Sequence, residues 1–68
     1  MGIKEIGEQI KQRRDILRIQ QKDLAELSGI SLRTIIQIES GAANPSFDTL
    51  QKLAQVVGMQ IQLVIKNK

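Results

Sequence analysis

Residues 21–39 contain two short apolar-patterned segments separated by a three-residue turn with one glycine, and this feature most restricts the fold. The inward positions of the two segments are Leu24, Ala25 and Leu27, followed by Ile35 and Ile38. Gly29 follows the first segment, where a left-handed residue commonly ends a helix, and Ile30 packs the turn. Ser31 is a good N-cap for the second segment. We therefore expect two short helices, 21–28 and 32–39, joined by a tight turn, which is the helix-turn-helix unit.

Helical patterns are also predicted on both sides of this unit. Residues 3–17 carry apolar side chains at helical spacing, namely Ile3, Ile6, Ile10 and Leu17. After a loop at 41–45, Ser46 is placed to cap a helix that ends at Gly58. Its apolar stripe consists of Phe47, Leu50, Leu53, Ala54 and Val57. The predicted fold class is therefore all-α, with four helices in one domain over residues 1–58.

The composition excludes several kinds of function. The chain has 68 residues, 41% of them hydrophobic, and it contains neither cysteine nor histidine. Disulfides, thiolate or imidazole catalysis and zinc-finger ligation are thus absent, and no glycine-rich phosphate loop occurs. We expect no catalytic residues, no metal and no cofactor. The chain is therefore not expected to be an enzyme. The missing disulfides, signal peptide and membrane span favour a cytoplasmic location.

The net charge of +3 suits an anionic partner, but its distribution is more informative. Residues 1–20 and 46–68 each have a net charge of +2, whereas residues 21–45 have a net charge of −1. The central unit is not a polycation. If it binds DNA, specific contacts must come from this unit, and neutralisation of the phosphates must come from the flanks.

The apolar period changes in the C-terminal segment, residues 59–68. Met59, Ile61, Leu63 and Ile65 occupy alternate positions, which is typical of a strand. A single strand leaves its main-chain groups without partners. We therefore expect it to pair with the same strand of a second copy in a homodimer; a frayed tail or a fifth helix are the alternatives.

The packing residues Leu24, Ala25, Gly29, Ile30, Ile35 and Ile38 resemble those of the Cro/repressor-type (XRE-like) helix-turn-helix family of transcriptional regulators. A second block matches in register, with Glu39-Ser40-Gly41, Asn44-Pro45-Ser46, Thr49-Leu50, Leu53-Ala54 and Gly58. The resemblance covers about residues 3–58 and implies a lambda-repressor-like domain that binds double-stranded DNA. The terminal strand is similar to that of the HipB-like antitoxin branch. That branch implies an autoregulatory homodimeric repressor or, as the alternative, an antitoxin that mainly neutralises a kinase-like toxin protein.

The helix over 32–39 should place its outer face in the major groove, where the base pairs differ in their hydrogen-bonding groups. The side chains opposite Ile35 and Ile38 are Leu32, Arg33, Ile36, Gln37 and Ser40. Arg33 can bond a guanine edge and Gln37 an adenine edge. Arg33 could instead be a solvated charge or a phosphate ligand. Leu32 and Ile36 could contact thymine methyl groups or form a patch for a protein partner.

Phosphate contacts are expected from Gln21, Thr34, Asn44, Arg18 and Lys52, and from free amides at helix starts. The resemblance assigns Gln21 a second role in bracing the recognition helix. Many relatives carry a basic residue after Gly41, but this chain has Ala42 and Ala43, so we expect a modest dependence of binding on salt.

The resemblance also implies a structural ion pair between Arg14 and Glu39 that orients the recognition helix. Arg14 is therefore expected to be scaffold rather than a DNA ligand. A homodimer would bind a roughly palindromic operator with half-sites about 34–36 Å apart.

Overall fold

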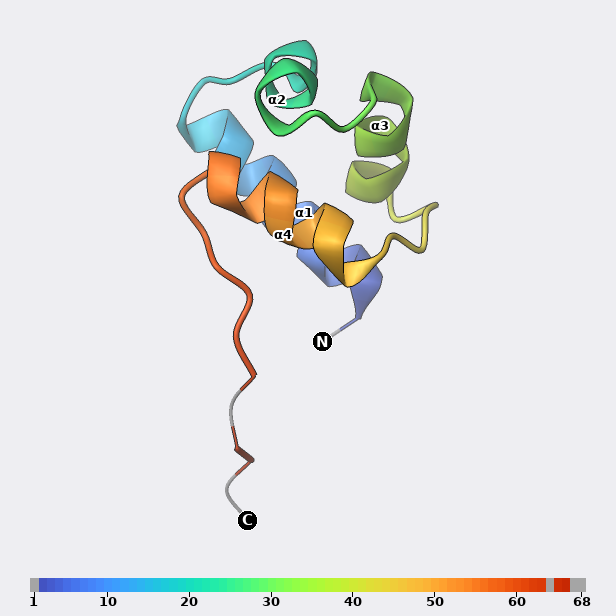
Figure 1. Cartoon of the computed structure of the whole chain (residues 1–68), viewed down its shortest axis with the longest axis vertical. Helices are drawn as coiled ribbons and strands as arrows, with labels where there is room; N and C mark the ends of the chain where they lie inside the picture. Colours follow the sequence, from blue (N-terminus) through green and yellow to red (C-terminus); the bar gives the residue numbers. More distant parts are fainter. Residues whose placement is uncertain (1, 64, 67–68) are drawn as a thin grey trace.

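Each helix begins with a side chain that pairs with a main-chain amide near its N-terminus. The computed structural model describes residues 2–63 and 65–66 and contains the helices α1 (Ile3–Ile16), α2 (Gln21–Ser28), α3 (Leu32–Ser40) and α4 (Phe47–Val56) (Figure 1). Ser31 Oγ accepts from the Thr34 amide at 3.2 Å, and Ser46 Oγ accepts from the Thr49 amide at 3.1 Å. Both serine caps were predicted from the sequence, because a hydroxyl at this position satisfies one of the free amides of the first turn.

Two glycines allow the sharp turns around α3. Gly29 has φ +76° and ends α2, and Gly41 has φ +82° and ends α3. A left-handed backbone costs glycine little, so both turns can be tight. The predicted left-handed position at Gly29 is confirmed. The end of α1 is different, because Arg18 adopts φ +59° although it carries a side chain.

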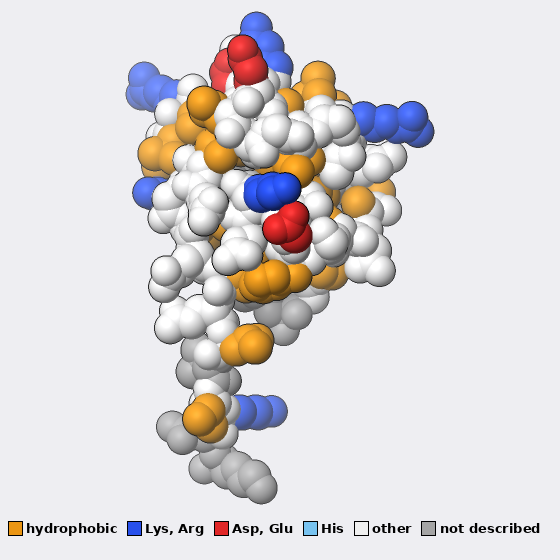
Figure 2. Space-filling model, in the orientation of Figure 1, with side chains coloured by type: hydrophobic (Ala, Val, Ile, Leu, Met, Phe, Trp, Pro, Cys, Tyr) orange, Lys and Arg blue, Asp and Glu red, His pale blue; other side chains and the backbone are white. Residues whose placement is uncertain are grey.

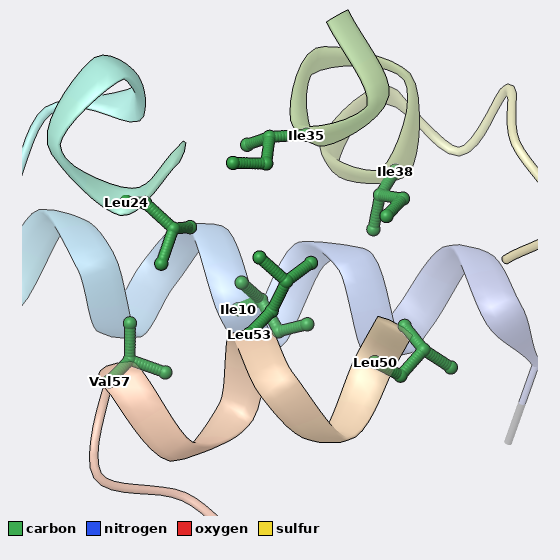
Figure 3. Packing of buried hydrophobic residues seen from close by; sticks show 7 residues of the cluster. All are labelled: Ile10, Leu24, Ile35, Ile38, Leu50, Leu53 and Val57. Carbon is green, nitrogen blue, oxygen red and sulfur yellow. The ribbon is translucent and has the colours of Figure 1, made fainter. Parts of the chain in front are cut away.

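The core lies where α2 and α3 pack across the α1 and α4 pair (Figures 1 and 3). Its buried members come from all four helices and from the residue after α4; they are Ile10, Leu24, Ile35, Ile38, Leu50, Leu53 and Val57. All are aliphatic. The apolar positions assigned inward on α3 are buried as predicted, so the opposite face of α3 is left at the surface.

Three apolar side chains were predicted inward and are exposed: Leu17, Leu27 and Phe47. The inward face of α2 follows Gln21, Leu24, Ala25 and Ser28, at the three- and four-residue spacing of a helix stripe, and Leu27 falls beside it. Phe47 is the first residue of α4 and Leu17 follows the last residue of α1, and both ends have fewer neighbours to cover them. Three predicted helix ends also differ: α1 ends at Ile16, α3 extends to Ser40, and α4 ends at Val56, before the predicted end at Gly58.

A close approach of α1 to α3 depends on Gly7. A Cβ atom added to Gly7 would collide with the main-chain carbonyl of Ile38. Glycine within a helix lowers stability by about 1 kcal/mol relative to alanine. At this position the absent side chain lets the two backbones meet.

The C-terminal segment leaves α4 as an extended chain (Figure 1). Met59 and Ile61 pack against the core, whereas Leu63 and Ile65 are almost fully exposed. The predicted strand is not formed in the described part of this segment, since a single chain offers it no edge to pair with. Its pairing across a dimer stays a prediction. Among the described residues, no helix is long and apolar enough to span a membrane.

Candidate nucleic-acid interface

The outer face of α3 presents a compact set of polar and apolar side chains. The predicted base-contacting residues Leu32, Arg33, Ile36, Gln37 and Ser40 are all exposed. Arg33 is the one exposed charge on α3, because its other ionisable residue, Glu39, is buried. The Ser40 hydroxyl donates to the Gln37 carbonyl at 3.0 Å, which leaves it best suited to accept a hydrogen bond. This face therefore offers amide and guanidinium donors beside two aliphatic side chains.

A buried ion pair fixes α3 against α1. Arg14 Nε donates to Glu39 Oε2 at 2.8 Å, and the terminal guanidinium nitrogen Nη2 donates to Glu39 Oε1 at 2.9 Å. The third nitrogen, Nη1, donates to the Ile19 carbonyl at 2.8 Å, after α1 has ended. Two parallel bonds between planar groups hold orientation as well as distance. Arg14 thus joins α1, the connection to α2, and α3.

The start of α2 is joined to the same carboxylate. Gln21 Nε2 donates to Glu39 Oε1 at 2.9 Å. Glu39 of α3 therefore receives hydrogen bonds from both α1 and α2, and no buried side-chain nitrogen or oxygen in the described chain lacks a partner. Complete satisfaction of a buried polar network favours one rigid arrangement.

The surroundings of Arg14 favour the charged form of its guanidinium. The hydrogen bond to Glu39 raises the pKa of Arg14 above its ordinary value; burial opposes this, and the charges of Glu39 and Asp15 add to the rise. Because the Glu39 carboxylate is neutralised within the domain, α3 does not present a negative charge toward DNA phosphates.

The predicted phosphate ligands do not all lie together. Gln21 and Thr34 occupy the first turns of α2 and α3, and Asn44 is exposed in the loop after α3. Lys52 lies on α4, where its ammonium is 3.2 Å from the Asp48 carboxylate. The connection that carries Arg18 lies across α2 from α3 (Figure 1). Gln21 and Thr34 therefore belong to the helix-turn-helix unit itself, whereas Asn44, Lys52 and Arg18 lie on other segments.

A helix-turn-helix family model matches residues 10–64, which includes the whole network and the exposed face of α3. The chain belongs to the XRE-like helix-turn-helix family of DNA-binding regulators. Family membership agrees with the geometry, since α2 and the exposed α3 form the unit that the family is named for. It also identifies the domain as a regulator rather than an enzyme.

Two similar proteins carry the same description. The chain is 41% identical over 57 residues to an uncharacterized HTH-type transcriptional regulator of Haemophilus influenzae, covering 79% of this chain and 58% of that relative. It is 38% identical over 53 residues to an uncharacterized HTH-type transcriptional regulator of Methanocaldococcus jannaschii, covering 78% of this chain and 80% of the relative. The first relative thus extends well beyond the matched region. No solved structure matches the chain.

Sequence reasoning missed the roles of two α1 residues. One supports the contact of α1 with α3, and the other supports the end of α4. Gly7 permits the contact between α1 and α3, and its only sequence signal is a glycine inside a helical pattern. Arg13 Nε donates to the Val57 carbonyl at 2.9 Å and so satisfies the end of α4. The sequence shows Arg13 only as a basic residue in the last turn of α1.

Proposed function

We propose that this helix-turn-helix regulator is a sequence-specific transcriptional repressor that binds the major groove through α3. The observation that carries the proposal is the exposed pair Arg33 and Gln37 on a helix held by the Arg14–Glu39 ion pair. Arginine and glutamine make bidentate contacts to guanine and adenine edges, respectively. Rigid support matters because a base contact requires a fixed approach of the side chain.

Leu32 and Ile36 complete the proposed contact surface. Leu32 is 42% exposed and Ile36 is 46% exposed, one turn apart on the same face of α3. Thymine is the one base that presents a methyl group in the major groove. We therefore expect thymines beside the positions that Arg33 and Gln37 contact. Gln21, Thr34, Asn44, Arg18 and Lys52 are proposed to set the register through phosphates.

The proposed active form is a homodimer joined by the C-terminal segment. Support comes from the alternation of Met59, Ile61, Leu63 and Ile65, the last two of which protrude from the domain. A two-fold dimer places two copies of α3 on one duplex, which predicts a palindromic operator with half-sites about 34–36 Å apart. Repression of its own gene follows if such a site overlaps the promoter.

The test is fluorescence-anisotropy binding of the full chain to the duplex immediately upstream of its own gene. A scrambled duplex of the same length and composition is the control, at near-physiological salt. We expect a preference of about 100-fold or more, because specific binding is usually about 10³- to 10⁷-fold tighter than non-specific binding. Equal weak binding to both duplexes contradicts autoregulation.

The exposed Leu32 and Ile36 also favour a second function, binding of a toxin protein as an antitoxin. Exposed apolar side chains are common in protein interfaces as well as beside thymine. Leu32→Ser separates the two functions. Weaker operator binding supports the DNA contact, whereas unchanged DNA affinity together with lost binding to the protein encoded beside it supports the antitoxin.

A further inference from the structure

The C-terminal segment already has the alternating burial of a strand that lies on the domain. Met59 and Ile61 are partly buried, whereas Gln60 and Gln62 are exposed. The Gln60 Nε2 and Gln62 Oε1 atoms are 3.4 Å apart, so the two amides lie on one side of the segment. Met59 and Ile61 therefore pack against the domain, whereas Gln60 and Gln62 lie mostly in solvent.

The domain offers an apolar groove beside the odd-numbered side chains. It is lined by α1, α4 and the start of the segment, with the apolar residues Ile6, Ile10, Ala54, Met59 and Ile61 and the polar residues Gln9, Gln60 and Gln62. Its volume is about 230 Å³. That is below the range of about 300–1,000 Å³ usual for pockets that hold drug-sized molecules. Aliphatic side chains from another chain fit its size and chemistry better than a metabolite.

The same segment supplies the side chains that such a groove lacks. Leu63 is 98% exposed and Ile65 is 93% exposed. They continue the odd-numbered face after the chain has left the domain, and Figure 2 shows apolar side chains on the segment standing clear of the body. In the described part of residues 60–66, no main-chain hydrogen bond is formed. A second copy of this chain supplies a strand edge for the unpaired main-chain groups and an identical groove for the exposed apolar side chains.

Resting on the proposed homodimer, we infer its register: the segments pair antiparallel about a two-fold axis at Gln62. Met59 then lies opposite Ile65 of the partner subunit, and Ile61 opposite Leu63 of the partner subunit. Each domain-bound apolar residue is thereby covered by a protruding one. Leu63 and Ile65 close the groove of the partner domain.

In neighbouring registers, fewer of the four apolar residues have an accessible apolar residue opposite them. An axis at Ile61 would place Ile65 opposite Val57, whose side chain is fully buried and whose carbonyl already accepts from Arg13. An axis at Leu63 would leave Met59 without an apolar residue opposite it. An axis at an even-numbered residue other than 62 pairs fewer of the four apolar residues. The axis at Gln62 alone pairs all four.

The absence of cysteine from the sequence allows a direct test by disulfide trapping. Gln62→Cys would place two thiols opposite each other, with Cα atoms about 4.5–5.5 Å apart, within the range a disulfide spans. Gln60→Cys is the matched control, on the same outward side, with its two copies about four residues apart along the pair. We expect rapid intermolecular cross-linking of Gln62→Cys and little of Gln60→Cys under the same mild oxidation.

The side-chain part of the inference is tested with Leu63→Asp. The wild-type residue is almost fully exposed within one chain, so the domain should fold unchanged. We expect the dimer dissociation constant, from sedimentation equilibrium, to rise about tenfold or more. Gln60→Asp puts the same charge on the opposite side of the segment and should change the dimer dissociation constant far less.

The outcomes separate this register from the proposed dimer itself. A wild-type chain that sediments as a dimer while Gln62→Cys fails to cross-link overturns the register alone. Equal cross-linking of both cysteine variants indicates a parallel pair and overturns it as well. A wild-type monomer at high micromolar concentration overturns both the register and the homodimer.

Discussion

Arg14 of α1 and Glu39 of α3 form a two-point hydrogen-bonded ion pair across 25 residues of sequence, with distances of 2.8 and 2.9 Å. The Glu39 side chain is only 3% exposed. The pair is therefore a buried one, in which loss of either partner leaves an unpaired charge in the domain. Because Gln21 donates to the same carboxylate, the orientation of the whole helix-turn-helix unit depends on Glu39.

Replacing Glu39 with alanine should be strongly destabilising. We expect Glu39→Ala to lower the free energy of unfolding by about 3–5 kcal/mol, which is most of the stability of a domain this small. Urea unfolding followed by circular dichroism measures it. Asp15→Ala is the control, because its exposed carboxylate is 3.3 Å from the same guanidinium and should contribute at most about 1 kcal/mol. Equal small effects of both variants would contradict the structural importance of the buried pair.

Gly7→Ala should destabilise the domain although alanine is the better helix former. The added methyl group would meet the Ile38 carbonyl, which is main chain and cannot rotate away. We expect a loss of about 1–3 kcal/mol in thermal or urea unfolding, as for other overpacked sites. Glu8→Ala, at the exposed neighbouring position, is the control. A stabilised Gly7→Ala would mean that α1 and α3 do not approach closely here.

The sequence was sufficient where local chemistry decides the structure and insufficient where two distant segments meet. Ser31, Ser46 and Gly29 were predictable because capping hydroxyls and left-handed turns depend on a few neighbouring residues. Gly7 was not, because its partner lies 31 residues away in the sequence. The inward position of Leu27 was wrong because an eight-residue helix allows more than one choice of apolar face.

The candidate site, too, could be predicted from the sequence only in part. The outward face of α3 followed from the inward positions of Ile35 and Ile38, since a helix has only one side opposite its core. The proximity of Gln21 to Glu39 depends on how α2 crosses α3, which periodicity alone does not give. Which of the exposed residues contact bases depends on the DNA, so these assignments stay predictions.

Arg18→Gly should separate a backbone effect from a phosphate contact. Arg18 has φ +59°, where a side chain costs about 1 kcal/mol that glycine avoids. We expect Arg18→Gly to be more stable to urea than Arg18→Ala by about that amount. Both variants lose the charge, so an Arg18–phosphate contact would weaken operator binding in both and lower the salt slope by about 1. Equal stability of the two variants would argue against the left-handed conformation.

Arg33 and Lys52 should differ in what their loss does to DNA binding. Arg33 is exposed on the outer face of α3, whereas Lys52 lies on α4 with its charge next to Asp48. We expect Arg33→Ala to cost about 1–3 kcal/mol on the preferred operator and to lose discrimination at one or two base pairs. Lys52→Ala should weaken binding evenly across sequences, as the loss of a phosphate contact does. Anisotropy titrations against a panel of single-base-pair operator variants, at two salt concentrations, measure both. If Arg33→Ala also weakened binding evenly across the panel, Arg33 would be a phosphate ligand, and base discrimination would have to come from Gln37 and its aliphatic neighbours on α3.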